Sequence, residues 1–502
     1  MNKKALLLIL DGWGIGEKND HDAIFQAKPE YWNSLWLNYP HAVIHCKEDS
    51  VGLPEGCLSG SEVGHMTLGA GRVIWQNVAK IDRDIADGSW YQNPILINTK
   101  KHLEKNKGKL HLVGLFSDGG IHSHIKHILA LIDWAKKEGL SSVALHLFLD
   151  GRDMPPKSAV DLLKEKLFSV LDNNIQIATV CGRAIAMDRS ENWERTITAF
   201  NLLTKKEEIE KIPVAEFLQK GYQESITDEF VQPTRFNDWV VSENDAVVFF
   251  NFRADRMRQM IRLFTGLAPH VEMQKISVPS NLYLVSLTEY DPEFREVWVM
   301  YPPEYPVNTL GEWIAKKGLK QFRVAETEKY AHVTYFFNGG REEVFEGEER
   351  LVVPSLGLTN YSTHPEMSLP EVTKTLLWAL ASKKFDLVVC NIANGDMVGH
   401  SGDLSAGIKA VLAVEEALLK QIIPAAEKNG FTTLITADHG NIEQMWHNGE
   451  PHTAHTFNEV PLVVIDKNIE LKEEGHLYQI APTVLKIMGI EKPEEMTGEA
   501  MF

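Results

Sequence analysis

The sequence is poor in cysteine, with only Cys46, Cys57, Cys181 and Cys390 in 502 residues and no Cys-x-x-Cys pair. A chain of this length can bury a large core without disulfides. Scattered single thiols are typical of a reducing compartment, so we expect a cytoplasmic protein. The absence of a cysteine cluster also argues against a thiolate zinc site.

Basic residues and long apolar runs are also scarce. Against 69 Asp and Glu there are 51 Lys and Arg, a net charge of −18 with neutral His. Such a chain is repelled by nucleic acid and anionic membranes, so neither is an expected partner. No segment approaches the ~20 apolar residues of a membrane helix. The run 5–10 is too short for a signal peptide and is expected to be a buried strand.

The remaining composition is that of an ordinary globular protein, with 44% hydrophobic and 24% charged residues. Short apolar runs alternate with amphipathic stretches, which predicts an α/β fold with largely parallel sheets covered on both faces. A proline cluster at 301–306 suggests a domain boundary. Strands are expected at 5–10, 110–115, 143–149, 176–180, 246–250, 281–286, 387–390, 432–436 and 461–465, and helices at 124–137, 158–172, 192–204, 405–429 and 477–488.

Polar motifs follow several of these strands. In parallel sheets, function collects where strands end and loops begin. Asp-Gly pairs are also ordinary turn chemistry, so no single motif is decisive. The motifs are Asp11-Gly12, Ser117-Asp118-Gly119-Gly120, Asp150-Gly151-Arg152-Asp153, Asn251-Phe252-Arg253 and Ala437-Asp438-His439-Gly440.

The C-terminal third is rich in possible metal ligands. Asp396 and His400 are four residues apart and would share one face of a helix. Carboxylate with imidazole suits Mn²⁺, Zn²⁺ or Fe²⁺. Each histidine alone could instead make an ordinary hydrogen bond, but together these residues are too many for one ion. Two ions ~3.5–4 Å apart, as in metal-dependent phosphoryl transfer, would use the full set, which continues with Asp438, His439, His452 and His455.

A possible nucleophile lies in the glycine-rich stretch around Ser61. Glycines allow the backbone to approach a ligand closely, and a serine at a helix start lies where anions bind well. A serine hydroxyl needs a base or a metal to become a good nucleophile. The alternative is that Ser61 merely caps a helix.

These motifs together resemble those of the 2,3-bisphosphoglycerate-independent phosphoglycerate mutases. They follow the family order from the N-terminus to near residue 460, so the resemblance covers nearly the whole chain. The segments that carry it are Asp11–Gly14, Gly60–His65, Ser117–His124, Asp150–Lys157, Asn251–Arg256, Ala325–Tyr330, Asp396–His400 and Ala437–Asn441.

The resemblance implies an alkaline-phosphatase-like α/β domain, residues 1–76 and 303–502, split by an inserted α/β transferase domain, residues 77–302. It implies a monomer that interconverts 3-phosphoglycerate and 2-phosphoglycerate in glycolysis and gluconeogenesis. The reaction would use two divalent ions, most often Mn²⁺, and a phosphoserine intermediate, without 2,3-bisphosphoglycerate.

The family's site residues transfer to this chain by motif. Asp396, His400 and His455 would hold one ion, and Asp11, Ser61, Asp438 and His439 the other. Ser61 would be the nucleophile, and we assign Asp153 as the acid and base that serves the glycerate oxygens. Substrate contacts would fall on His122, Arg152, Asp153, Arg183, Arg189, Arg253, Arg256 and Lys329.

Some positions depart from the family pattern. Gly60 stands where asparagine is usual, Ala184-Ile185 where two tyrosines are common, and Gly395 and Ala331 where proline is usual. None removes a ligand, the nucleophile or an arginine. Two rival interpretations are a metal-dependent phosphatase or other phosphomutase on the same metal core, and a non-catalytic metal-binding protein. The second would be expected to have lost Ser61 or a ligand.

Overall fold

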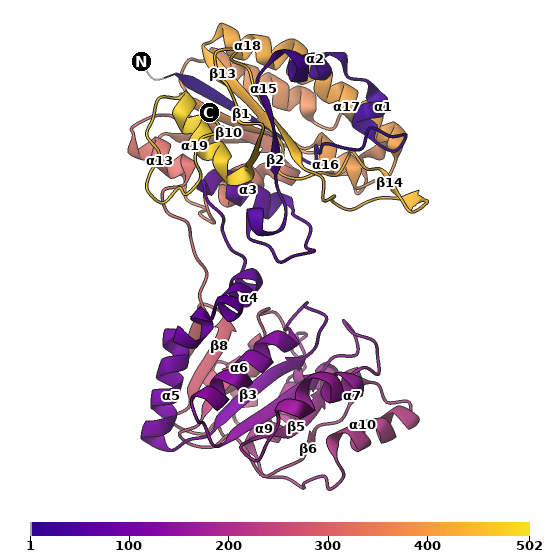
Figure 1. Ribbon diagram of the computed structural model, residues 1–502, viewed down its shortest axis with the longest axis vertical. Coiled ribbons are helices and arrows are strands. Elements are labelled where there is room, and N and C mark those ends of the chain that lie inside the picture. The colour runs from indigo at the N-terminus through magenta and orange to yellow at the C-terminus, as the bar shows by residue number, and fades with distance from the viewer. Residues whose placement is uncertain (1–2) are drawn as a thin grey trace. The chain divides into compact units, whose positions relative to one another are not determined.

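The computed structural model describes residues 3–502, which form two compact units (Figure 1). The first unit joins the chain up to Gln76 with Glu304–Phe502, and the second is the continuous stretch Asn77–Pro303. Pro303 thus lies with the second unit, one residue beyond the junction that the sequence suggested. Within residues 3–502 there is no helix with the length and apolar character needed to cross a bilayer.

The first unit is built on an eight-stranded sheet in the order β11-β10-β12-β1-β13-β16-β2-β17. β16 runs antiparallel to β13 and β2, and the other neighbouring strands are parallel. Every residue from Ala5 to Leu10 is at most 1% exposed, so both faces of β1 are covered. The strands are β1 (Lys4–Leu10), β2 (His41–His45), β10 (Gln321–Glu326), β11 (Glu348–Val353), β12 (Leu387–Ile392), β13 (Phe431–Thr436), β16 (Val460–Val464) and β17 (Glu474–His476), with a separate hairpin of β14 (Trp446–His447) and β15 (Glu450–Pro451).

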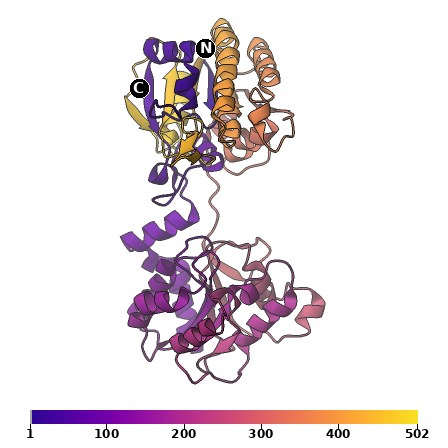
Figure 2. The same ribbon diagram turned by 90° about the vertical axis from the view of Figure 1, so that its right-hand side faces the viewer.

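Helices cover this sheet. Figure 2 shows the orange helices α15, α17 and α18 grouped on one side of the strands. The side chain of Asp403 caps α17 by accepting a hydrogen bond from the Ala406 amide at 3.1 Å. The helices are α1 (Ala23–Ala27), α2 (Glu30–Asn38), α3 (Ser61–Ala70), α13 (Leu310–Lys316), α14 (Thr327–Ala331), α15 (Leu369–Ala381), α16 (Asn394–Gly399), α17 (Leu404–Ala417), α18 (Ile423–Lys428) and α19 (Ile480–Ile487), with π-helical turns at His332–Phe336 and Leu418–Ile422.

The second unit contains a seven-stranded sheet in the order β6-β5-β4-β3-β7-β8-β9, parallel except for β6. Leu112 and Val113 of β3 enter different hydrophobic cores, one on each face. The strands are β3 (Leu110–Phe116), β4 (Val143–Leu149), β5 (Ile175–Gly182), β6 (Thr234–Arg235), β7 (Ala246–Phe249), β8 (Tyr283–Thr288) and β9 (Val297–Tyr301). The helices are α4 (Asn77–Asp87), α5 (Pro94–Asn106), α6 (Ile125–Lys137), α7 (Ala159–Leu162), α8 (Arg183–Ala186), α9 (Trp193–Thr204), α10 (Val214–Gln223), α11 (Arg258–Thr265) and α12 (His270–Met273).

The α/β class and all nine expected strands are confirmed, with ends that differ by up to two residues. The regular helix expected over 158–172 is wrong in its extent. Only α7 is α-helical there, and the chain continues through a π-helical turn, Leu163–Leu167, and a 3-10 turn, Phe168–Val170. The helix expected over 405–429 is divided into α17 and α18 by a π-helical turn.

Candidate active site

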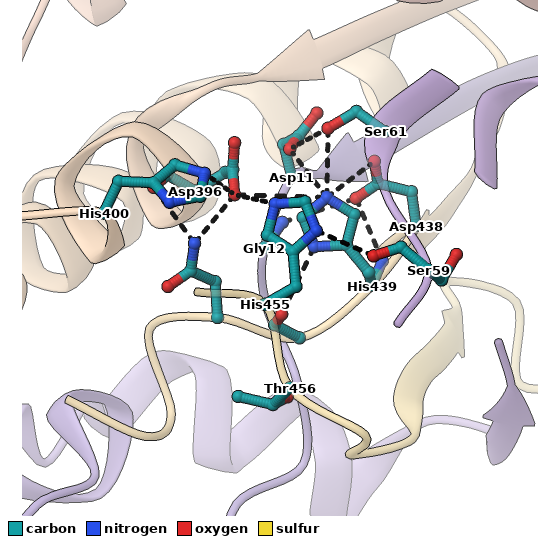
Figure 3. A network of polar contacts seen from close by, with 12 residues as sticks. Asp11, Gly12, Ser59, Ser61, Asp396, His400, Asp438, His439, His455 and Thr456 are labelled. Carbon is teal, nitrogen blue, oxygen red and sulfur yellow. Dashed lines mark hydrogen bonds and ion pairs between the residues drawn. The ribbon is translucent and has the colours of Figure 1, made fainter. Parts of the chain in front are cut away.

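Three neighbouring strands of the first unit bring acidic residues to one edge of the sheet. β1 pairs in parallel with β12 and with β13, so the carboxyl ends of all three meet. Asp11 directly follows β1, Asp396 lies in α16 after β12, and Asp438 follows β13. All three are at most 2% exposed. Figure 3 shows their carboxylates converging with Ser61 and three histidines.

Ser61 is the first residue of α3 and is 7% exposed. Its hydroxyl can donate to Asp11 Oδ1 at 3.1 Å and lies 3.0 Å from His439 Nε2. The Lys329 ammonium donates to the same hydroxyl oxygen at 2.7 Å. The oxygen of a potential nucleophile therefore lies between a carboxylate, an imidazole and a cation, which is an arrangement that can activate it.

The three histidines His400, His439 and His455 present the same ring nitrogen to the cluster. Each Nδ1 faces a backbone carbonyl, which can only accept a hydrogen bond, so Nδ1 carries the proton. Nε2 is then unprotonated, and its lone pair is free to bind a metal. Ordered metal-binding histidines typically show this pattern. The accepting carbonyls belong to Thr453, Gly440 and Ser59, at 2.8, 3.3 and 2.7 Å, respectively.

The free imidazole nitrogens and the carboxylates lie within reach of common ions. Asp396, His400 and His455 offer one set of ligand atoms within 4.8 Å of one another, and Asp11, Asp396 and His439 offer another. Asp396 Oδ1 is 3.2 Å from Nε2 of both His400 and His455. Mixed carboxylate and imidazole donors of this kind fit divalent metals. The residues present therefore fit a metal centre.

Lys329, which was predicted as a substrate contact, lies among these carboxylates of the first unit. Its ammonium donates to Asp11 Oδ1 at 2.7 Å and to Asp396 Oδ2 at 2.6 Å. Burial would raise the pKa of Asp396, but the charge of Lys329 holds it well below its usual range. Burial and the nearby Asp438 raise the pKa of Asp11. Lys329 thus compensates part of the negative charge of this cluster.

His65 supports the cluster, and the sequence reasoning gave it no role. Its Nδ1 donates to the Ser61 carbonyl at 2.8 Å and lies 3.2 Å from Asp438 Oδ2. The Asn391 amide donates to His65 Nε2 at 3.0 Å and to Asp11 Oδ2 at 2.7 Å. Both ring nitrogens are therefore occupied, so His65 positions its neighbours. Its four-residue spacing from Ser61 on α3 was the available sequence signal.

The second unit gathers charged residues at the carboxyl ends of its parallel strands. His122 follows β3, Asp153 follows β4, and Arg183 begins α8 directly after β5. The backbone amides of Phe252 and Arg253, after β7, donate to the His122 carbonyl at 2.9 and 3.2 Å. The topology therefore brings the predicted substrate residues of this unit to one edge of its sheet.

Arg183 is the buried centre of this second cluster, at 2% exposure. Its Nη1 donates to Asp153 Oδ2 at 2.5 Å and to Asp150 Oδ1 at 2.6 Å. The pKa of Arg256 is lowered, first by burial and then by the positive charge of the nearby arginines. Asp150 was part of a quoted motif but was not predicted as a site residue. Its buried carboxylate fixes the positions of Arg183 and Asp153 relative to each other.

Asp255 is a second carboxylate that the sequence reasoning missed. It accepts from Arg189 Nη1 at 2.9 Å and lies 3.4 Å from Arg253 Nε and 3.2 Å from His122 Nδ1. The side chains of Arg189 and Arg253 are half exposed, so they can reach a ligand. The remaining predicted residue, Arg152, is 58% exposed and lies 3.6 Å from Glu229.

Glu326 precedes the helix that carries Lys329 and makes stability depend on pH. Burial raises the pKa of Glu326 to about 7. Between about pH 4.5 and 7 the folded protein keeps this proton while the unfolded chain loses it. The free energy of unfolding should therefore fall by up to about 3 kcal/mol as pH rises through this range.

Glu326→Gln should remove this dependence, because the amide carries no titrating proton. Urea unfolding with chelator present, at pH 5 and pH 8, tests this. Between pH 5 and pH 8, we expect the free energy of unfolding of the variant to rise by about 2 to 3 kcal/mol relative to that of the parent. Parallel pH profiles would contradict the assignment.

Comparisons with known proteins show the family of this chain. Residues 3–492 match the model of the Metalloenzyme superfamily. Relatives named 2,3-bisphosphoglycerate-independent phosphoglycerate mutase occur in Hahella chejuensis and Escherichia coli K12. They are 46% and 44% identical, each covering 100% of this chain and 98% of the relative. The chain belongs to the 2,3-bisphosphoglycerate-independent phosphoglycerate mutase family.

A solved structure supports the same family. It is described as Leishmania mexicana phosphoglycerate mutase at low cobalt concentration, with a TM-score of 0.59 and 29% identity. The similarity covers 100% of this chain and 98% of that one. Because the matches cover 100% of this chain, family membership extends to both of its units.

Proposed function

We propose that this protein interconverts 3-phosphoglycerate and 2-phosphoglycerate in glycolysis and gluconeogenesis, through a phosphoserine at Ser61 and without 2,3-bisphosphoglycerate. The observation that carries the proposal is the position of Ser61 Oγ, within 3.1 Å of Asp11, His439 and Lys329. The family relationship supplies the substrate pair. We further propose a monomer that works in the cytoplasm.

We propose that two divalent ions, most often Mn²⁺, bind in the first unit. Asp396, His400 and His455 would hold one ion, and the other would be held by Asp11, Ser61, Asp438 and His439. When bound, the ions would neutralise charge on the transferring phosphoryl oxygens. The Leishmania relative was described with cobalt, and the carboxylate and imidazole donors suit cobalt as well as manganese.

Ser61 reacts as the alkoxide, its proton having gone to solvent beforehand. The first transfer forms a bond from Ser61 Oγ to phosphorus while the bond from phosphorus to the glycerate oxygen breaks, and the second transfer returns the alkoxide. Lys329 is placed to stabilise the attacking oxygen, because its ammonium already donates to Ser61 Oγ at 2.7 Å. Asp153 protonates the departing oxygen. It then removes the proton from the other hydroxyl, which attacks phosphoserine and regenerates Ser61.

Glycerate must stay bound between the two transfers. We propose that Arg253 and Arg256 hold its carboxylate, because guanidinium groups bind carboxylates in a bidentate manner. His122, Arg152, Arg183 and Arg189 would complete the anion-binding set.

The products distinguish this proposal from a phosphatase. Purified protein with Mn²⁺ and 3-phosphoglycerate should yield 2-phosphoglycerate with little free phosphate. Free phosphate released at the rate of substrate loss, with no 2-phosphoglycerate, would instead favour hydrolysis on the same metal core. Recovery of 3-phosphoglycerate from added 2-phosphoglycerate completes the assay, because an isomerase works in both directions.

A further inference from the structure

Glu443 is a buried carboxylate with an unusual set of partners. It is 2% exposed and lies four residues after His439. Oε2 accepts from the backbone amides of Gly14 at 3.0 Å and Asn441 at 2.8 Å. Oε1 accepts from the Asn458 amide at 2.9 Å and from the Thr456 hydroxyl. Each carboxylate oxygen therefore accepts two hydrogen bonds.

Each donor lies close in sequence to a proposed metal ligand. Gly14 is three residues after Asp11, Asn441 is two after His439, and Thr456 directly follows His455. The Asn441 side chain also reaches the fourth ligand segment, since its amide donates to Asp396 Oδ1 at 2.8 Å. One carboxylate thus joins the loops after β1 and β13 to the His455 loop, and through Asn441 to α16.

The surrounding backbone leaves room for this carboxylate and little else. A Cβ at Gly14 would lie 2.4 Å from Glu443 Cδ, and one at Gly440 would lie 2.3 Å from Oε1. Two loops therefore pack against the carboxylate at glycine positions. Besides the hydrogen bonds, this close approach also indicates that the loops are shaped around Glu443.

We propose that Glu443 is the positioning residue of the metal centre, which sets the spacing of the ligands through hydrogen bonds rather than through its charge. The inference rests on the proposed metal binding of this chain. Groups that orient metal ligands from behind typically change metal affinity about tenfold to a hundredfold when lost.

Two variants separate hydrogen bonding from charge. In Glu443→Gln the amide oxygen can still accept from Gly14 and Asn441, while Thr456 and the Asn458 amide can reorient to accept from the new NH₂. In Glu443→Met the volume is similar but every acceptor is lost. We expect the Mn²⁺ dissociation constant of E443Q to stay within about threefold of the parent, and that of E443M to rise at least about tenfold.

The experiment is Mn²⁺ titration of the metal-free full chain, followed by calorimetry or by the EPR signal of free Mn²⁺, with thermal unfolding of each metal-free variant alongside. The matched control is Glu459→Gln, which changes a nearby carboxylate that pairs with Lys47 and His45. The Mn²⁺ affinity of this variant should equal that of the parent. Equal affinity in E443M and the parent overturns the positioning role. Equal losses in E443Q and E443M overturn the hydrogen-bond account in favour of charge.

If E443M does not fold, Thr456→Val removes a single donor and should weaken Mn²⁺ binding about fivefold, beyond the threefold margin set for E443Q. An affinity of this variant within about threefold of the parent overturns the inference. If the parent itself binds no Mn²⁺, the proposed metal centre fails first and the inference falls with it. Normal binding by parent and E443M alike rejects the inference and leaves the proposed function intact.

Discussion

Ser61→Ala should abolish mutase activity, with a loss of about 10⁴-fold or more, because no other oxygen can form the covalent intermediate. The hydroxyl is the group that Asp11, His439 and Lys329 surround. The change removes one atom and leaves the start of α3 otherwise intact. The measurement is the rate of 2-phosphoglycerate formation, together with mass spectrometry of quenched protein for a phosphoryl group on Ser61.

Ser34→Ala is the matched control, since it removes a serine hydroxyl of α2 that donates to the Tyr31 carbonyl at 2.8 Å. Its activity should equal that of the parent. Appreciable isomerisation by S61A, or a phosphoryl group on the parent at another residue, would rule out the covalent scheme.

Asp153→Asn should lower kcat by about 10²- to 10⁴-fold with a smaller change in KM, because the amide can neither give nor take the proton that both transfers need. The side chain has nearly the same shape and can still accept a hydrogen bond from Arg183, its partner at 2.5 Å. The loss should therefore fall on the chemical step rather than on folding. Steady-state kinetics across pH 6 to 9 measures this split.

Asp172→Asn is the control for Asp153, because Asp172 belongs to the same unit, precedes β5 and pairs with Lys136 at 3.5 Å. It should leave kcat and KM unchanged. A D153N variant with the parent's kcat would contradict the assignment of Asp153, and a large rise in KM alone would make it a binding residue.

The fold was predictable where apolar runs are continuous. β1, β4 and β12 are buried on both faces, so all but one residue in each is apolar and the pattern is unambiguous. β10 was not predicted, because it contains Gln321, Arg323 and Glu326. These polar residues are nevertheless at most 1% exposed. Glu326, for example, accepts a hydrogen bond from the Ser368 backbone amide at 3.0 Å, and sequence spacing does not show such a distant partner.

The candidate site was also predictable from the sequence only in part. Asp396 and His400 were paired correctly by their four-residue spacing, and they lie 3.2 Å apart. The position of Lys329 beside Asp11 and Asp396 depends on the pairing of β10 with β12, which local sequence does not encode. Glu443 was missed for a similar reason, because its role lies in contacts with loops from three parts of the chain.

The central claim is a metal-dependent mutase that needs no bisphosphoglycerate. Its most direct test is the conversion of 3-phosphoglycerate to 2-phosphoglycerate after chelation and after restoring Mn²⁺, Co²⁺, Mg²⁺ or Zn²⁺ in turn, with no 2,3-bisphosphoglycerate added. We predict that chelation abolishes the conversion and that Mn²⁺ restores it. Conversion that survives complete removal of metal, or that returns only when 2,3-bisphosphoglycerate is added, would contradict the account.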